Sequence, residues 1–296
     1  MLKLTIKYLA IVLVMFCVKT LQAQENENAI IFHITSAHTS FPDTGRSKGH
    51  LYDGKLYSAT QHYHDSSVLI VVPKNFIANK KVAIIYWFHG WGNHIDSAAT
   101  RYELIKQFIE SKRNAVLVLP ETAYNAPDSY GGKLENKGEF KLLTTDILNA
   151  LKAKQLIDKS SVAGNLILAG HSGAYRVMAY ILQNGALQVQ EALLFDALYG
   201  QTDKYITWLK SDNKHRFIHL FTNYGEGTLE ESKHMVEILK DEKMDFVEFE
   251  EPDLKKAIIK NNRIIFLHSL KQHNDIISPI NFKLMLEASP FLKALN

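Results

Sequence analysis

Cysteine is almost absent from this chain: it occurs once in 296 residues, as Cys17, in an apolar stretch near the N-terminus. The rest of the chain therefore has no disulfide framework and no cysteine nucleophile, and a metal site built on thiolates is excluded. If the N-terminal stretch is removed, about 270 residues remain, which is enough to bury a stable hydrophobic core without cross-links.

Long hydrophobic runs are also missing, with one short exception. Lys3 and Lys7 precede an apolar run, Tyr8–Val18, and Ala23 follows soon after it. A basic start, a short apolar run and a small residue predict a secretory signal peptide over residues 1–23. The run is too short to span a bilayer comfortably. We therefore expect export to the periplasm or the exterior, with no stable membrane insertion after cleavage; an uncleaved N-terminal anchor is the alternative.

An excess of charge of either sign is absent as well. The chain has 34 basic and 31 acidic residues, a formal net charge of +3. Lys3, Lys7 and Lys19 are the charged residues of the predicted signal peptide, so the remainder carries 31 of each sign. This balance argues against a nucleic-acid partner. With no repeat or long linker, the sequence predicts one domain over residues 24–296, in which residues 24–66 form a β-rich lead-in.

The chain does contain an alternation of apolar strands and amphipathic helices. This alternation, sustained from residue 81 onward, predicts an α/β fold with a mostly parallel sheet and helices on both faces. We expect strands at Ala29–Thr35, Ser67–Val72, Lys81–Phe88, Ala115–Leu119, Leu166–Ala169, Glu191–Phe195, Arg216–Thr222 and Arg263–His268. We expect helices at Asp96–Ser111, Glu139–Leu156, Tyr175–Gln183, Asp203–Lys210, Leu229–Asp241 and Ile280–Leu295.

One of these strands ends in a turn of small residues around a serine. The apolar run Leu166–Ala169 leads into Gly170–Ala174, of sequence GHSGA, and a helical segment begins at Tyr175. Strand, sharp turn and helix in this order form the pattern of a nucleophile elbow. The turn would hold the Ser172 hydroxyl at the carboxyl edge of the sheet, where the N-terminus of the helix favours developing negative charge.

A second turn, His89–Gly92 of sequence HGWG, follows the strand Lys81–Phe88. With the elbow and the chain order of serine, acid and histidine, it makes the chain resemble the α/β-hydrolase superfamily over roughly residues 67–296. The chain is most similar to the secreted esterase branch that includes esterase D, feruloyl esterases and polyhydroxybutyrate depolymerases. The resemblance implies an α/β-hydrolase fold in which Ser172 is the nucleophile.

The same resemblance assigns the other catalytic groups. It places the general base in the loop after the last strand, which contains His268 and His273. We prefer His273, because it lies far enough past the strand for the loop to reach over the sheet edge. The resemblance also implies an oxyanion hole made by the backbone amides of Trp91 and Gly173.

Two residues compete for the position of the catalytic acid. Asp196 ends the strand Glu191–Phe195, where a carboxylate without a partner would be costly. Glu226 follows the next strand, which is where most members of the superfamily carry the acid, whereas pancreatic-type lipases use the earlier position. We favour Asp196 and keep Glu226 as the alternative.

Further residues of the two turns are expected to lie beside the substrate: His89, Gly90, Gly92 and His171. Acyl transfer by a triad needs no cofactor, and we predict none. His62 and His64 alternate on a β-like stretch, but no acid or cysteine stands at clear ligand spacing, so we predict no metal either.

These features favour a secreted serine hydrolase, specifically a carboxylesterase that acts through a Ser–His–Asp triad and an acyl-enzyme. The expected partner is a small-molecule or polymer-derived ester. A serine peptidase or amidase, an acyltransferase, and a non-catalytic binding protein on the same scaffold are the alternatives.

Overall fold

The computed structural model describes residues 27–251 and 256–295. The predicted signal peptide, residues 1–23, lies outside the described residues. Within those ranges, no helix has the length and the apolar character needed to cross a membrane.

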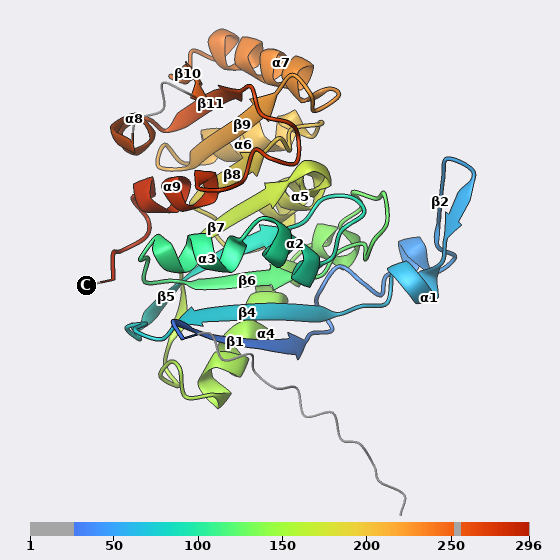
Figure 1. The fold of residues 1–296 in the computed structure, drawn as a ribbon, viewed down its shortest axis with the longest axis vertical. Helices are drawn as coiled ribbons and strands as arrows, with labels where there is room; N and C mark the ends of the chain where they lie inside the picture. The colour runs from blue at the N-terminus through green and yellow to red at the C-terminus, as the bar shows by residue number, and fades with distance from the viewer. Residues whose placement is uncertain (1–26, 252–255, 296) are drawn as a thin grey trace, which may run out of the picture.

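A sheet of nine strands forms the centre of the described part of the chain (Figure 1). β4 pairs antiparallel with both β1 and β6, and the other neighbouring strands are parallel. The strands are, in spatial order, β1 (Ala29–Thr35), β4 (Ser67–Pro73), β6 (Val116–Pro120), β5 (Lys81–Phe88), β7 (Val162–His171), β8 (Glu191–Phe195), β9 (Arg216–Thr222), β11 (Ile264–Ser269) and β10 (Val247–Glu250). The prediction of a mostly parallel sheet is confirmed.

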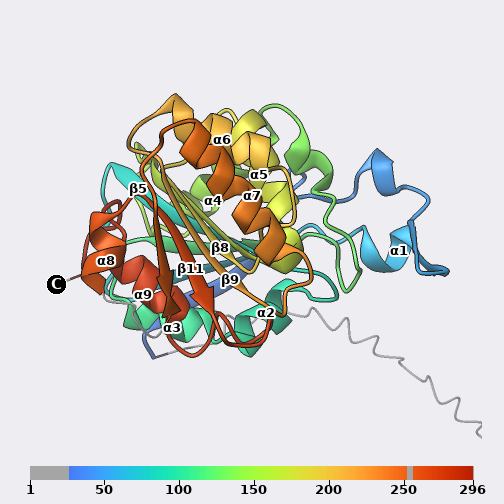
Figure 2. The same ribbon diagram turned by 90° about the horizontal axis from the view of Figure 1, so that it is seen from above.

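Helices cover both faces of this sheet, as Figure 2 shows from above. One face carries α4 (Glu139–Ala153), α5 (Tyr175–Asn184), α6 (Thr202–Ser211) and α7 (Thr228–Asp241). The other carries α2 (Ile95–Arg101), α3 (Leu104–Glu110), α8 (Lys256–Asn261) and α9 (Asn281–Ala288). Alternate residues of a strand enter opposite cores: Tyr86 of β5 packs on the first face and Trp87 on the second. Burial on both faces explains why β5 is a continuous apolar run.

The order of the strands creates a topological switch point between β5 and β7. From β5 the chain passes through α2 and α3 to β6 on one side, whereas from β7 it passes through α5 to β8 on the other. The connections that leave the carboxyl ends of β5 and β7 therefore diverge. Ligands of open α/β sheets bind at such a switch point.

Some elements differ from the prediction. The single helix expected at Asp96–Ser111 is two helices, α2 and α3, because Glu103 adopts the left-handed conformation with φ of 50°. The closing helix is shorter than expected and ends at Ala288. The structure also contains β10 and α8 near the edge of the sheet, which the sequence did not predict.

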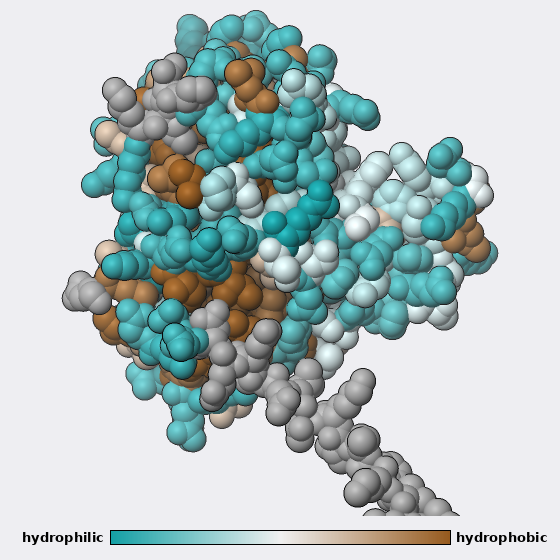
Figure 3. Space-filling view, in the orientation of Figure 1, coloured by the Kyte–Doolittle hydropathy of each residue, from teal (hydrophilic) through white to brown (hydrophobic). Residues whose placement is uncertain are grey.

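Part of the lead-in segment forms a projection at the carboxyl edge of the sheet, whereas its strand β1 belongs to the sheet itself (Figure 1). The projection contains a hairpin of β2 (His50–Tyr52) and β3 (Lys55–Tyr57), followed by the short helix α1 (Ala59–His62). Leu51 and Leu56 on the hairpin are 68% and 59% exposed. Figure 3 shows apolar atoms on this projection within a largely hydrophilic surface.

Candidate active site

Ser172 stands in a strained turn at the end of β7. Its φ is 55°, a left-handed value that side chains other than glycine rarely adopt. The turn is tightly packed, because a Cβ added to Gly170 would lie 2.6 Å from both Ala174 Cβ and Met178 Sδ. A 3-10 turn, η3 (Ser172–Ala174), leads directly into α5. Strain of this kind is maintained by the surrounding packing and is common at active sites.

His273, in the loop after β11, is paired with Asp196 at the end of β8. Its Nδ1 lies 2.6 Å from Asp196 Oδ2, and the aspartate side chain is fully buried. The carboxylate also accepts hydrogen bonds from Thr228 Oγ1 at 2.5 Å and from the Thr222 amide at 3.2 Å. Burial by itself would raise the pKa of Asp196, but the hydrogen bonds from His273 and Thr228 outweigh it and hold the pKa below its usual value. Asp196 is therefore ionised at neutral pH.

Glu226, the alternative acid, lines the same cavity as His273 but is not paired with it. It is exposed on the loop after β9, and within the described ranges no hydrogen bond joins it to His273. The preceding residue, Gly225, lies against the other acid: a Cβ on Gly225 would lie only 2.3 Å from Asp196 Oδ2. The loop backbone thus packs directly over the Asp196 carboxylate, and the structure pairs His273 with Asp196 rather than with Glu226.

Two other histidines considered from the sequence are occupied elsewhere. The ring of His268 bonds Glu250 at 2.8 Å and Asn223 at 3.0 Å. His62 ends the helix α1 instead of lying on a strand, and its Nδ1 is 2.7 Å from the carbonyl oxygen of Tyr124. The described part of the chain contains no cluster of three or more His, Cys, Asp or Glu side chains that could hold a metal ion.

Ser172 and His273 open into one cavity of about 520 Å³. Aromatic side chains and short polar groups make up its wall: Tyr52, Trp91, Ser129, Ser172, Gly173, Tyr175, Tyr199, Tyr224, Gly225, Glu226 and His273. Among the residues described, no hydrogen bond joins the Ser172 hydroxyl to His273. Such bonds often tighten only when substrate binds.

The turn after β5 lies against the elbow. A Cβ on Gly90 would approach Ser172 Cβ to 2.6 Å and the Gly173 nitrogen to 3.3 Å, so only glycine allows this contact. The amide of Trp91 has no hydrogen-bond acceptor within residues 27–251 and 256–295. Gly92 has a φ of 62° and open space around its Cβ position, so its role is conformational. The turn that carries Trp91 thus lies against the elbow that carries Ser172 and Gly173.

His89 and His171 differ from expectation, because neither side chain lines the cavity. His89 is buried behind the turn and bonds Glu121 at 2.5 Å. His171 is buried against His273, with ring centroids 4.5 Å apart, and bonds the hydroxyl of Tyr102 at 3.2 Å. Burial, together with the nearby His273, lowers the pKa of His171 to about 3, so this ring is neutral. Both residues lie behind the site, outside the wall of the cavity.

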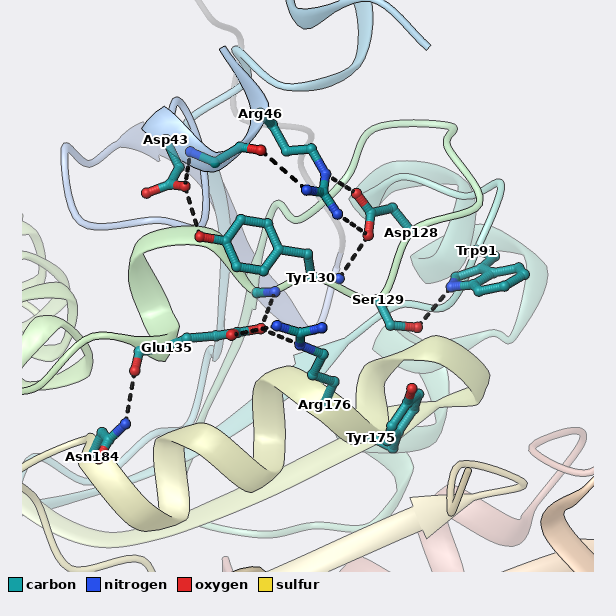
Figure 4. Close-up of polar contacts among 12 residues, drawn as sticks. Asp43, Arg46, Trp91, Asp128, Ser129, Tyr130, Glu135, Tyr175, Arg176 and Asn184 are labelled. Atoms are coloured by element: carbon teal, nitrogen blue, oxygen red, sulfur yellow. Dashed lines mark hydrogen bonds and ion pairs between the residues drawn. The ribbon is translucent and has the colours of Figure 1, made fainter. Parts of the chain in front are cut away.

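Polar contacts fix the wall of the cavity around Trp91 (Figure 4). The indole Nε1 donates to Ser129 Oγ at 2.7 Å, and the ring meets Tyr52 of the hairpin edge-on at 5.3 Å. A Cβ on Gly173 would lie 2.4 Å from Trp91 Cδ1, so the indole covers the elbow closely. The lead-in segment therefore contributes directly to the site.

Two ion pairs anchor the loop that carries Ser129 (Figure 4). Arg46 donates to the two oxygens of Asp128 at 2.5 and 3.0 Å, and Arg176 donates to those of Glu135 at 2.7 and 2.9 Å. The Tyr130 ring lies between the two guanidinium groups, with centroid distances of 4.6 and 5.2 Å. This arrangement joins the lead-in segment, the loop and α5 into one rigid wall.

Sequence reasoning missed most of the aromatic wall, namely Tyr52, Tyr175, Tyr199 and Tyr224. Tyr175, Tyr199 and Tyr224 follow the carboxyl ends of β7, β8 and β9, which is the signal that could have found them. Tyr52 is the hardest to predict, because its hairpin lies far from the elbow in the sequence.

Comparisons with known proteins agree with this architecture. A scan against protein-family models gave no match, and neither did a search of curated proteins. Among solved structures, the fold matches a feruloyl esterase module from Clostridium thermocellum complexed with sinapinate, with a TM-score of 0.53 and 10% sequence identity over 90% of this chain and 88% of that one. It also matches a ferulic acid esterase, with a TM-score of 0.54 and 12% identity over 89% and 99% of the two chains.

A third similar structure is the fluorophosphonate-binding serine hydrolase FphF of Staphylococcus aureus. Its TM-score is 0.51 at 10% identity, covering 88% of this chain and 98% of that one. At such identities the likeness concerns the fold. The chain has the fold of the α/β-hydrolases, as the sequence resemblance predicted.

Proposed function

We propose that this protein is a serine hydrolase that cleaves carboxylic esters. One observation carries the proposal: a serine at a left-handed φ of 55° shares a cavity with a histidine whose other nitrogen is held by a buried aspartate. A neutral serine hydroxyl is a poor nucleophile and needs a base oriented by a third group. Ser172, His273 and Asp196 are of the residue types that this chemistry needs.

In the proposed reaction, Ser172 Oγ attacks the ester carbonyl while His273 Nε2 takes its proton. Asp196 holds the His273 ring through Nδ1 and stabilises the imidazolium that forms. The amides of Trp91 and Gly173 donate to the oxyanion of the tetrahedral intermediate. His273 then protonates the departing alkoxide, which leaves an acyl-enzyme, and water repeats the sequence to release the acid and restore the serine.

The substrate is proposed to be a small-molecule or polymer-derived ester, and residues 1–23 are proposed to direct export. The aromatic wall of the 520 Å³ cavity supports a ring-bearing acyl or alcohol group. Because one of the similar folds is a feruloyl esterase module complexed with sinapinate, methyl sinapate is a suitable first substrate. Mass measurement of the protein secreted by its host would show whether cleavage occurs after Ala23.

Fluorophosphonate labelling of purified protein, followed by peptide mapping, tests the nucleophile. We expect one label, on Ser172, and none in Ser172→Ala. A folded wild-type protein that takes no label would overturn the proposal and favour a non-catalytic binding protein on this scaffold. Matched ester and anilide substrates separate an esterase from an amidase or peptidase, and added alcohol acceptors reveal an acyltransferase.

A further inference from the structure

His89 makes a set of contacts that the proposed reaction leaves unused. Its side chain is 2% exposed, and that of Glu121 is 1% exposed. Nδ1 lies 2.8 Å from the carbonyl oxygen of Gly90, whereas Nε2 lies 2.5 Å from Glu121 Oε1 and 2.8 Å from Thr122 Oγ1. Both ring nitrogens are therefore engaged, away from the cavity.

The chemistry of these partners decides where the protons are. A carbonyl oxygen can only accept, so Nδ1 must carry a hydrogen. An ionised carboxylate also only accepts, so Nε2 must carry a second hydrogen to bond Glu121. The Glu121 carboxylate also accepts hydrogen bonds from the amides of Ile95 at 3.1 Å and Thr122 at 3.2 Å.

Electrostatics agrees with this assignment. Burial alone would lower the pKa of His89, but the charge and the hydrogen bond of Glu121 outweigh it and raise the pKa above the usual value. Glu121 is the charged group that acts on the ring. The raised pKa favours the imidazolium form of His89 beside the Glu121 carboxylate.

The position of this charge relates it to the oxyanion hole. The Gly90–Trp91 peptide is trans, since the cis bonds of the described chain lie elsewhere. In a trans peptide the C=O and the N–H point in opposite directions. Fixing the Gly90 oxygen against His89 therefore directs the Trp91 N–H to the opposite side, and the Gly90 backbone itself packs on Ser172.

We propose that His89 is a positioning residue of the oxyanion hole: its imidazolium, held by Glu121, fixes and polarises the Gly90–Trp91 peptide so that the Trp91 N–H donates strongly to the oxyanion. A cation that donates to a carbonyl withdraws charge from the amide and makes its N–H a better donor. The inference rests on the proposed function for its catalytic consequence, but the charge of His89 can be measured independently.

The first experiment is NMR on the wild-type protein with ¹⁵N-labelled histidine, assigned by loss of signals in His89→Asn. We expect both ring nitrogens of His89 to be protonated at neutral pH, and Glu121→Gln to leave only one protonated. One protonated nitrogen in the wild type would overturn the proposal, whether or not the protein hydrolyses esters.

The second experiment measures kcat and KM on an ester that the wild type hydrolyses. His89→Ala should lower kcat by about 10²–10³-fold with little change in KM, the usual loss for one oxyanion donor. His89→Asn, whose amide can still donate to the Gly90 oxygen, should recover part of that loss. Folded variants that keep kcat within about twofold would refute the positioning role, as would equal losses in His89→Ala and His89→Asn.

A matched control removes a histidine from a similar pair outside the site. His38 bonds Glu139 at 2.8 Å and lines no part of the cavity. His38→Ala should leave kcat and KM unchanged. If wild-type protein hydrolyses no ester at all, the proposed function fails, while the NMR result still decides the charge state of His89.

Discussion

Two histidine–carboxylate pairs lie at the carboxyl ends of the strands, and they differ in their access to solvent. His273 bonds Asp196 at 2.6 Å and His89 bonds Glu121 at 2.5 Å. The His273 side chain is 23% exposed and its Nε2 has no partner among the residues described, whereas His89 is 2% exposed and uses both nitrogens. A general base needs one free nitrogen that can take and return a proton. A histidine bonded to a carboxylate thus suits proton transfer where one ring nitrogen is free, as in His273, and a fixed charge where both are bonded, as in His89.

The different roles of the two histidines require that Ser172 shares its cavity with His273 and not with His89. Ser172→Ala should lower kcat/KM for an ester by about 10⁴–10⁶-fold, because the whole covalent route is lost. Circular dichroism and thermal unfolding should match the wild type. Retained hydrolysis in a folded variant would show that Ser172 is not the nucleophile.

Replacing the acid sharpens the comparison further. Asp196→Asn should lower kcat by about 10⁴-fold, because the amide would hold the His273 ring in the wrong tautomer. Glu226→Gln is the matched change on the neighbouring loop and should lower kcat far less. The opposite ranking in a kinetic assay would assign the acid to Glu226 and contradict the pairing seen in the structure.

Loss of the carboxylate should lower the free energy of unfolding more for the enclosed His89–Glu121 pair than for a partly exposed pair. Glu121→Ala leaves a buried imidazolium without its carboxylate and should lower the free energy of unfolding by about 3–5 kcal/mol. Glu139→Ala, which removes the partner of the half-exposed His38, should cost less than about 1 kcal/mol. Chemical denaturation measures both, and similar losses would mean that the Glu121 pair is not the charged, enclosed pair described above.

His219 is a third buried histidine, and no carboxylate is hydrogen-bonded to it among the residues described. Burial lowers the pKa of His219 to about 4, although the charge of Asp196 opposes the shift. The unfolded chain therefore binds a proton between about pH 6.5 and 4 that the folded chain does not, and stability falls as the pH drops through this range. His219→Leu should flatten the slope of unfolding free energy against pH by up to about 1.4 kcal/mol per pH unit. An unchanged slope would show that His219 is already protonated when folded.

Much of the sheet could be predicted because its strands are buried on both faces and read as apolar runs. β5 and β8 begin and end where the residue pattern indicates. The edge elements β10 and α8 were missed, since β10 alternates between half-buried and exposed residues and lacks such a run. The split between α2 and α3 was missed because a left-handed residue such as Glu103 leaves the spacing of apolar residues almost unchanged.

The sequence by itself determined the local features: the glycines around Ser172, the apolar strands and the residue types that hydrolysis needs. Gly170 is required because Ala174 and Met178, which follow it shortly in the chain, leave no room for a Cβ. Only the tertiary structure decided which acid meets His273 and that Tyr52 and Ser129 shape the cavity. It also turned His89 away from the cavity to Glu121. These outcomes depend on contacts between segments that are distant in the chain. The local pattern of residues does not specify which distant segments come into contact.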